Sequence, residues 1–353
     1  MKKLNVAIIG QGRSGRDIHG AFFRSEANEL FNVVAVVDAL EHRRERAAKE
    51  YGCPVYADYH ELFDVEGIDL VVNSTFSHMH APITIDLLSH GFNVVCEKPF
   101  AKTYEDACRV ILAAKQNGRM VNAFQQSRFA PYFEKITEIL DSGKLGEVMQ
   151  VAIRFNGFAR RWDWQTSKAY AGGGVRNTGP HPLDQAMYLL GFPEDTTVFS
   201  RLGRANTAGD GEDYAKIILT APGKPLIDVE ISSCDCYSPY TYRISCKNGS
   251  LRATTNKIEM RYFDPNTAAP LHQIMEPLEN AEGLPAYCSE KLDWKEETIE
   301  ISGSVFTDSV RKYYEMIYAN LTEGTPMPIT PEQVLTQLKV IDKIHAQNPL
   351  TVF

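Results

Sequence analysis

Residues 5–15 read Asn5-Val6-Ala7-Ile8-Ile9-Gly10-Gln11-Gly12-Arg13-Ser14-Gly15. The first five form an apolar run that is typical of a buried parallel strand. The last six match the pattern G-x-G-x-x-G, whose glycines permit a tight turn and a close approach of a ligand to the backbone. We therefore predict a strand, a phosphate-binding turn and a helix over Gly15–Ser25, with all six turn residues as candidate contacts of a dinucleotide.

The segments that follow continue to alternate between strand and helix. Apolar runs at Asn32–Val37, Asp69–Asn73 and Phe92–Cys96 alternate with helical patterns at Glu41–Tyr51, Ala81–His90 and Tyr104–Asn117. This order predicts an α/β fold in which a doubly wound parallel sheet carries helices on both faces.

Several residues near the ends of these strands are candidate cofactor contacts. Asp38 ends the second strand 23 residues after Gly15, where a carboxylate binds the adenosine ribose hydroxyls and repels a 2′-phosphate. NAD is therefore favoured, while Arg43 and Arg44 lie close enough to keep NADP as the less favoured alternative. The remaining candidates are Arg43, Ser74, Thr75 and His80, although packing at a helix start is an equally simple interpretation of the histidine.

The pattern changes after Phe124. A helix is predicted at Pro131–Leu140, and strand patterns follow at Glu147–Phe155, Tyr214–Leu219, Asp228–Ser233, Tyr242–Cys246, Leu251–Thr254 and Lys257–Tyr262. Short turns between them indicate a large, mostly antiparallel open sheet, and two amphipathic helices, Val310–Leu321 and Pro331–His345, end the chain. We predict a dinucleotide-binding Rossmann domain over residues 1–126 and an α+β domain for substrate binding and oligomerisation over residues 127–353.

Length and composition agree with a two-domain enzyme of 353 residues. With 37 basic and 45 acidic residues and no basic run, a nucleic-acid surface is disfavoured. No segment has the length of a membrane span. Seven scattered cysteines and no secretory signal favour reduced thiols in the cytoplasm. We expect no metal site and read Cys234 and Cys236 as buried apolar residues on a strand.

Two motifs carry candidate catalytic groups. Glu97-Lys98-Pro99 ends the run Phe92–Cys96, and ligands bind at the carboxyl ends of parallel strands, so Lys98 is expected to point into a crevice. In the segment 172–184, Pro182 suits the first position of a helix, and His181 then lies at its N-terminus, where backbone N–H groups favour a neutral imidazole suited to a general base. Asp184 is a candidate to orient His181, or simply completes the helix N-terminal charge pattern.

Two of the three tryptophans, Trp162 and Trp164, cluster with Arg160 before that segment. Aromatic faces beside hydrogen-bonding groups suit a sugar, whose rings present both C–H faces and hydroxyl edges. A loop anchored by buried tryptophans, or an oligomer contact, is the alternative interpretation.

Nearly the whole chain resembles the glucose-fructose oxidoreductase/inositol dehydrogenase/rhizopine-catabolism (Gfo/Idh/MocA) family. The resemblance rests on the Gly10–Gly15 turn, on Glu97-Lys98-Pro99, on Arg128 within Ser127–Pro131, and on Gly179-x-His181-x-x-Asp184. It implies a Rossmann domain joined to an α/β domain whose open sheet mediates homodimers or homotetramers, and oxidation of a secondary hydroxyl of a sugar or cyclitol with NAD(P).

The resemblance also implies roles for individual residues. Lys98 matches the active-site lysine and His181 the catalytic histidine, both also in contact with substrate, while Glu97 faces the nicotinamide-side ribose. Arg128 is a candidate for cofactor and substrate binding. The family often has an aspartate where this chain has Asn177, so either Asp184 supplies the missing charge or the mechanism depends more on Lys98.

The leading hypothesis is therefore an NAD-dependent dehydrogenase that acts on a sugar, glycoside or cyclitol hydroxyl. Two alternatives are an NAD-retaining glycosidase that oxidises its substrate transiently, and a non-catalytic regulator that senses NAD or a sugar.

Overall fold

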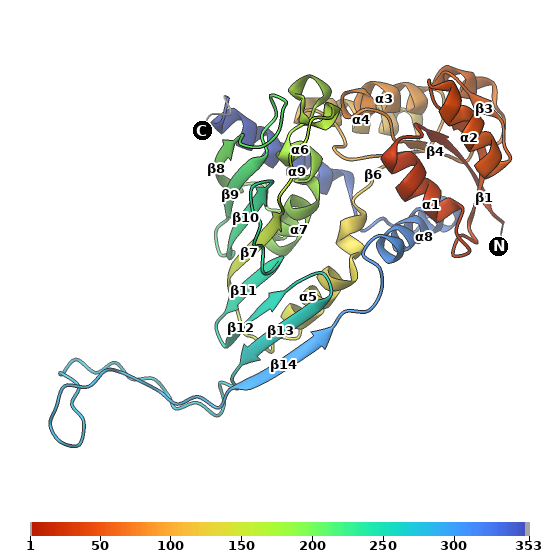
Figure 1. The fold of residues 1–353 in the computed structure, drawn as a ribbon. Coiled ribbons are helices and arrows are strands. Elements are labelled where there is room, and N and C mark those ends of the chain that lie inside the picture. The colour runs from red at the N-terminus through yellow and green to blue at the C-terminus, as the bar shows by residue number, and fades with distance from the viewer. Residues whose placement is uncertain (1, 350–353) are drawn as a thin grey trace.

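A computed structural model describes residues 2–349 of the chain, which build two sheets. The first sheet has six parallel strands in the order β3-β2-β1-β4-β5-β6 (Figure 1). Their bounds are β1 Leu4–Ile9, β2 Phe31–Val37, β3 Val55–Tyr56, β4 Leu70–Asn73, β5 Val94–Cys96 and β6 Val121–Ala123. This is the doubly wound sheet that the sequence predicts.

Helices cover both faces of the six-stranded sheet. A π-helical turn over Gly15–His19 continues into α1 (Gly20–Phe23), and α2 (Glu41–Tyr51) follows β2, whereas α3 (His80–Ser89) and α4 (Tyr104–Asn117) follow β4 and β5. From β1 the chain proceeds through β2 and β3 to one edge of the sheet, and from β4 through β5 and β6 to the other edge. Because such connections are right-handed, the two pairs of helices lie on opposite faces. The strand order reverses between β1 and β4, so a ligand crevice is expected at their carboxyl ends.

The second sheet has eight strands in the order β14-β13-β12-β11-β7-β10-β9-β8, all antiparallel except the β7–β10 pair. The bounds are β7 Val148–Asn156, β8 Thr197–Gly203, β9 Tyr214–Thr220, β10 Leu226–Ser232, β11 Tyr242–Cys246, β12 Gly249–Ala253, β13 Lys257–Tyr262 and β14 Lys295–Glu300. The predicted mostly antiparallel sheet is thus confirmed, with β8 and β14 as strands that the sequence pattern did not indicate.

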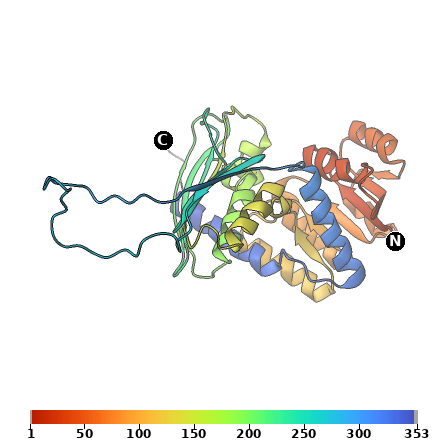
Figure 2. The same cartoon turned by 90° about the horizontal axis from the view of Figure 1, so that it is seen from below.

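Helices pack on one face of this second sheet. These helices are α5 (Pro131–Asp141), α6 (Gly174–Asn177), α7 (Pro180–Leu190) and α9 (Pro331–Gln347). The opposite face exposes Met149 and Phe199, together with the ion pairs that Asp228 makes with Arg154 and Lys216. The sheet therefore has one open face, as seen edge-on in Figure 2.

The last part of the chain returns to the first sheet. In α8 (Thr307–Glu323), Tyr313 and Tyr314 are fully buried, and the Tyr314 ring stacks on Phe22 of α1 with 5.0 Å between ring centroids. The boundary at residue 126 stays a prediction, but α8 shows that the first sheet draws part of its core from beyond that boundary.

One segment leaves the body of the molecule. Residues 263–294, between β13 and β14, form a long excursion without helix or strand, which we call the arm (Figures 1 and 2). Its sides are linked near the tip by a bridge between Glu279 and Pro285 and by the Ala286 N–H, which donates to the carbonyl oxygen of Leu278 at 2.9 Å. The arm has no core of its own.

Candidate active site

The glycine turn after β1 is built so that no side chain fills it. Gly10 has φ +92°, and a Cβ there would lie 2.5 Å from the carbonyl oxygen of Ser74. A Cβ on Gly15 would lie 1.9 Å from the carbonyl oxygen of Gly10. Gln11 is buried, and its Oε1 has no hydrogen-bond partner among residues 2–349. The turn therefore keeps backbone and one amide oxygen available to a ligand such as a pyrophosphate-linked dinucleotide.

Asp38 lies directly beside this turn. Its Oδ2 accepts a hydrogen bond from the Gln11 N–H at 2.7 Å, and its Oδ1 accepts one from the Leu40 N–H at 2.9 Å. The Arg43 guanidinium is 3.4 Å from the same Oδ2. A carboxylate and a guanidinium thus share the position at which the adenosine ribose is expected, and this arrangement alone does not decide between NAD and NADP.

The segment from the end of β4 to the start of α3 contributes the next group of predicted residues. Ser74 Oγ donates to the Ile9 carbonyl oxygen at 2.7 Å, which fixes the end of β1, and Thr75 Oγ1 donates to Asn73 Oδ1 at 2.8 Å. His80 is buried, with Nδ1 2.7 Å from the Pro99 carbonyl oxygen and Nε2 3.2 Å from that of Thr75. Burial lowers the pKa of His80, so the neutral imidazole has a single N–H, which it donates to one of these two carbonyl oxygens. His80 packs at the start of α3, and its contact with a cofactor stays a prediction.

Lys98 occupies the carboxyl edge of the sheet, as predicted. The Lys98–Pro99 peptide bond is cis, and Lys98 Nζ donates a hydrogen bond of 2.9 Å to the carbonyl oxygen of Asn177 in α6. Burial lowers the pKa of the Lys98 ammonium, Glu97 opposes that shift, and the positive charges of Arg13 and Arg161 add to it. The lysine therefore joins the two parts of the chain.

Glu97 is held by two residues that sequence reasoning missed. Its Oε1 lies 3.2 Å from His19 Nε2, and His19 Nδ1 lies 2.6 Å from the Tyr314 hydroxyl. Burial alone would raise the pKa of Glu97, but hydrogen bonding to His19 and the charges of His19 and Lys98 bring it to about 2. His19 follows Gly15 by one helical turn, which is a local signal, whereas nothing local points to Tyr314.

His181 lies at the start of α7, which begins at Pro180 rather than at the predicted Pro182. Its Nδ1 is 3.1 Å from Ser127 Oγ. Burial and the charge of Lys98 lower the pKa of His181 to about 3. The imidazole is therefore neutral near pH 7, as predicted, but through burial and Lys98 rather than through the helix N-terminus.

Asp184 does not orient His181. Its carboxylate forms a two-pronged ion pair with Arg128, with 2.9 Å between Arg128 Nε and Asp184 Oδ2, and both side chains are at most 4% exposed. Arg128 Nη1 also donates to the Pro328 carbonyl oxygen at 3.0 Å. The i, i+3 spacing placed Asp184 near His181, but an arginine from another element takes both carboxylate oxygens. Arg128 is likewise enclosed, which argues against its predicted contacts with cofactor and substrate.

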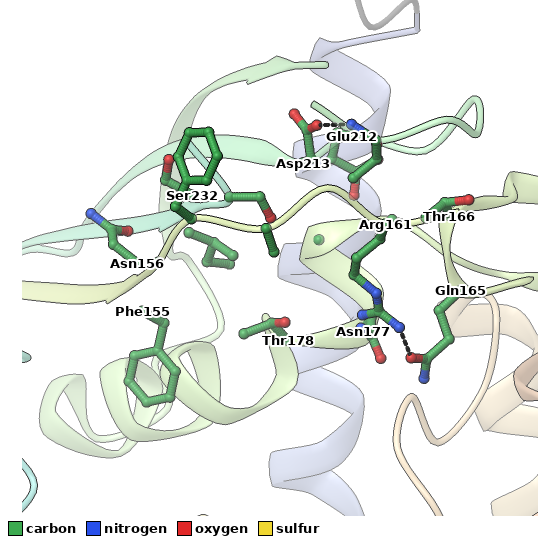
Figure 3. Close-up of a pocket in the computed structure, with 18 residues that line it drawn as sticks. Phe155, Asn156, Arg161, Gln165, Thr166, Asn177, Thr178, Glu212, Asp213 and Ser232 are labelled. Atoms are coloured by element: carbon green, nitrogen blue, oxygen red, sulfur yellow. Dashed lines mark hydrogen bonds between the residues drawn. The ribbon is translucent and has the colours of Figure 1, made fainter. Parts of the chain in front are cut away.

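A cavity of about 310 Å³ opens beside Asn177, between the ends of β7 and β10 and α6 (Figure 3). Arg161 points across it toward Gln165, close to Asn177. Within residues 2–349, three buried oxygens of its lining lack partners, namely Asn156 Oδ1, Thr207 Oγ1 and Glu212 Oε2. The other Glu212 oxygen, Oε1, accepts from the Val175 N–H at 3.0 Å.

The predicted tryptophan cluster is only partly at this cavity. Trp162 is 84% exposed and Arg160 is exposed, whereas Trp164 packs edge-on against Phe76 with 4.9 Å between ring centroids. Arg161 lines the cavity in place of its neighbours. Cys234 and Cys236, read from the sequence as buried, are exposed because the chain leaves β10 before them.

Metal and membrane sites are not found within residues 2–349. No group of three or more histidine, cysteine, aspartate or glutamate side chains is arranged to hold a metal ion. None of the helices in this range is long and apolar enough to cross a membrane.

The fold and the groups at its edge define an oxidoreductase with a Rossmann nucleotide-binding domain. The chain belongs to the GFO/IDH/MocA family: the model for the NAD-binding Rossmann fold of this oxidoreductase family matches residues 4–125, and the GFO/IDH/MocA C-terminal domain matches residues 133–252.

Two named relatives share between 24% and 32% of their aligned residues with this chain. The chain is 24% identical to the scyllo-inositol 2-dehydrogenase (NADP(+)) IolW of Bacillus subtilis, over 96% of this chain and 92% of that protein. It is 32% identical to the D-glucoside 3-dehydrogenase of Escherichia coli, over 58% of this chain and 60% of that protein. The structure of the oxidoreductase yvaA from Bacillus subtilis superposes with a TM-score of 0.81 at 19% identity, covering 99% of this chain and 96% of that one, which supports the fold alone.

Proposed function

We propose that this oxidoreductase transfers a hydride between nicotinamide and a secondary hydroxyl of a sugar, glycoside or cyclitol, with NAD as the favoured cofactor. The observation that carries the proposal is the placement of Lys98. Its Nζ donates to the carbonyl oxygen of Asn177, which lines the cavity, and burial together with the charge of Lys98 lowers the pKa of His181. Asp38 favours NAD, while Arg43 at 3.4 Å and the NADP(+) named for the Bacillus subtilis relative keep NADP as the alternative.

The cavity supports a polyhydroxylated substrate. Its volume of about 310 Å³ falls at the lower end of small-molecule sites, roughly 300–1,000 Å³. Buried acceptors without partners are costly, and a ligand rich in hydroxyl donors satisfies them. A D-glucoside and an inositol, named for two relatives, are ligands of this kind.

The chain's own groups suit alcohol oxidation. When His181 Nδ1–H donates to Ser127 Oγ, its Nε2 carries the lone pair that takes the hydroxyl proton. Lys98 Nζ gives one hydrogen to the Asn177 carbonyl oxygen and keeps two more for the substrate oxygen as negative charge develops there. The turn Gly10–Gly15, with Gln11 Oε1 and Asp38, would hold the dinucleotide, which supplies the hydride acceptor when bound.

The test is NADH formation with a panel of polyols and glycosides, comparing wild type with Lys98→Ala and His181→Ala. Each change is expected to lower turnover by on the order of 10²-fold or more. Lys102→Ala, an exposed lysine four residues further on, is the matched control and should keep wild-type turnover. Undiminished turnover in both active-site variants would refute the proposal. Substrate cleavage without stoichiometric NADH would instead indicate the NAD-retaining glycosidase.

The open face of the eight-stranded sheet and the free cysteines support two further parts of the proposal. Met149 and Phe199 are 56% and 64% exposed on that face, which we propose is covered in a homo-oligomer. All seven cysteines are unpaired, which suits a reducing compartment such as the cytoplasm.

A further inference from the structure

We propose that the arm of one molecule lies on the active-site rim of a second copy of this chain. The rim consists of Phe158, Arg160, Trp162 and Tyr237, and the arm is residues 263–294, as defined above. The inference concerns assembly and stands independently of the proposed substrate.

The arm carries apolar side chains that its own molecule leaves in water. Leu271, Met275 and Tyr287 are 88%, 80% and 99% exposed, and Ile274 and Leu284 are about 60% exposed. The arm forms no helix or strand and is joined across its tip by few backbone contacts. Contiguous exposed apolar residues on an extended hairpin mark an interaction segment rather than a stable free structure.

The rim is a matching surface on the same chain. Trp162 is 84%, Tyr237 91% and Phe158 58% exposed. The loops that carry them are joined by a bridge between Phe158 and Cys234 and by the Ala159 N–H, which donates to the Ser233 carbonyl oxygen at 3.0 Å. The rim therefore presents three aromatic side chains on two neighbouring loops, and one of them, Phe158, also lines the cavity.

Charge favours the same pairing. The arm contains six acidic residues (Asp264, Glu276, Glu279, Glu282, Glu290 and Asp293) and one basic residue, Lys291. The rim contains Arg160, whereas the neighbouring Arg161 is ion-paired with Asp163 at 2.6 Å and Asp235 accepts the Tyr237 N–H at 2.8 Å. The pairing is therefore mainly apolar, and Arg160 is the rim residue that faces the acidic charge of the arm.

The arm leaves the body at the end of the sheet opposite its own rim. Strand register aligns Tyr262, at the arm's base, with Gly249, Gly249 with Cys246, and Cys246 with Val148 at the start of β7. The rim follows Asn156 at the other end of β7, roughly 25–30 Å away along the nine-residue strand. The arm then extends further from the body (Figures 1 and 2).

A second copy of the chain can bring an arm and a rim together. In a twofold dimer that buries the open sheet faces with the strands antiparallel, the arm end of one sheet lies beside the rim end of the other. Each side of the arm has about 16 residues and reaches roughly 50 Å when extended. That reach is comparable to the diameter of the whole body, about 50 Å for a chain of this size.

The chain supplies its own probes for this contact. Cys288 is exposed on the arm, and Cys234 and Cys236 are exposed beside the rim. A short bismaleimide applied to the wild-type protein should yield a covalent dimer whose linked peptides join Cys288 to Cys234 or Cys236. Cys288→Ser should abolish the product, whereas Cys53→Ser, on a partly buried cysteine, should leave it unchanged.

Sedimentation velocity provides the second measurement. The triple variant Leu271→Ser/Met275→Ser/Tyr287→Ser alters only exposed side chains and should weaken self-association at least tenfold. Leu112→Ser, which changes a 54% exposed leucine on α4, is the matched control and should associate as wild type does. A wild-type monomer at all micromolar concentrations, unchanged association of the triple variant, or cross-links that join only Cys288 to Cys288 would each overturn the proposal.

Discussion

Removal of the Asp184 carboxylate tests whether this residue acts in structure or in catalysis. Asp184 and Arg128 are 3% and 4% exposed and form a two-pronged ion pair, with one contact at 2.9 Å. At that distance and an effective dielectric constant of about 20, the attraction is about 6 kcal/mol, most of which offsets the removal of two charges from water. In Asp184→Ala, the buried guanidinium keeps the Pro328 carbonyl oxygen, Gln333 and the rings of Tyr188 and Phe192 as partners, but no counter-ion.

The expected cost is therefore that of a buried charge without its counter-ion, about 3–5 kcal/mol in the free energy of unfolding. For a chain of this size that corresponds to a fall in Tm of about 4–7 °C, measured by differential scanning calorimetry. The double variant Arg128→Met/Asp184→Leu removes both charges and should recover most of the loss. Glu138→Ala breaks an exposed pair with Lys135 and should change stability by about 0.5 kcal/mol or less.

Two results would refute this reasoning. One is a Tm of Asp184→Ala within 2 °C of wild type (roughly a 1 kcal/mol effect at most). The other is an Asp184→Asn variant that unfolds as the wild type does and still forms no NADH, because the carboxylate would then act in the reaction rather than in the fold.

The remaining predictions concern the cofactor turn and the catalytic pair. Gly15→Ala places a Cβ 1.9 Å from the Gly10 carbonyl oxygen, so the turn must open, and NAD affinity measured by calorimetry should fall at least tenfold. Because the pKa of His181 is about 3, its base form is present above that pH, and kcat/KM should show no acid limb between pH 5 and 8. Asn177→Asp adds a carboxylate four residues before His181, which should raise that pKa and move the acid limb to higher pH. Tyr314→Phe leaves His19 Nδ1 without its 2.6 Å partner and should cost about 1–3 kcal/mol in urea unfolding.

The parts of the fold that were predictable are those encoded locally. The strand, glycine turn and helix around Gly10–Gly15 depend on apolar runs and on backbone space, and both are visible in a short window of sequence. Three of the four missed strands lack such a signal: β3 has two residues and β6 three, and β14 reads Lys-Glu-Glu-Thr-Ile-Glu. That polar segment forms a strand because it pairs with the neighbouring strand β13.

The residues of the candidate site also divide into those that a short window of sequence indicates and those that depend on tertiary contacts. Lys98 and His181 could be proposed from the sequence because each stands at the boundary of an element, where a side chain meets a ligand crevice. The Arg128–Asp184 pair was misread because spacing within one helix says nothing about an arginine 56 residues earlier. Tyr314 was missed because it is 295 residues from His19, and only tertiary packing of α8 on the first sheet brings the two together.

The electrostatics of the site assign the larger share of the proposed chemistry to Lys98. A histidine with a pKa of about 3 is neutral but a weak base, so proton transfer from an alcohol is favourable only if the developing oxyanion is stabilised. Glu97 opposes the lowering of that pKa, whereas Asn177 is uncharged and Asp184 is paired with Arg128. The cations near the oxyanion position are Lys98 itself and, through their effect on its pKa, Arg13 and Arg161. The same cations that lower the pKa of Lys98 also favour a negative oxygen, so weak basicity at His181 and positive potential around Lys98 compensate each other.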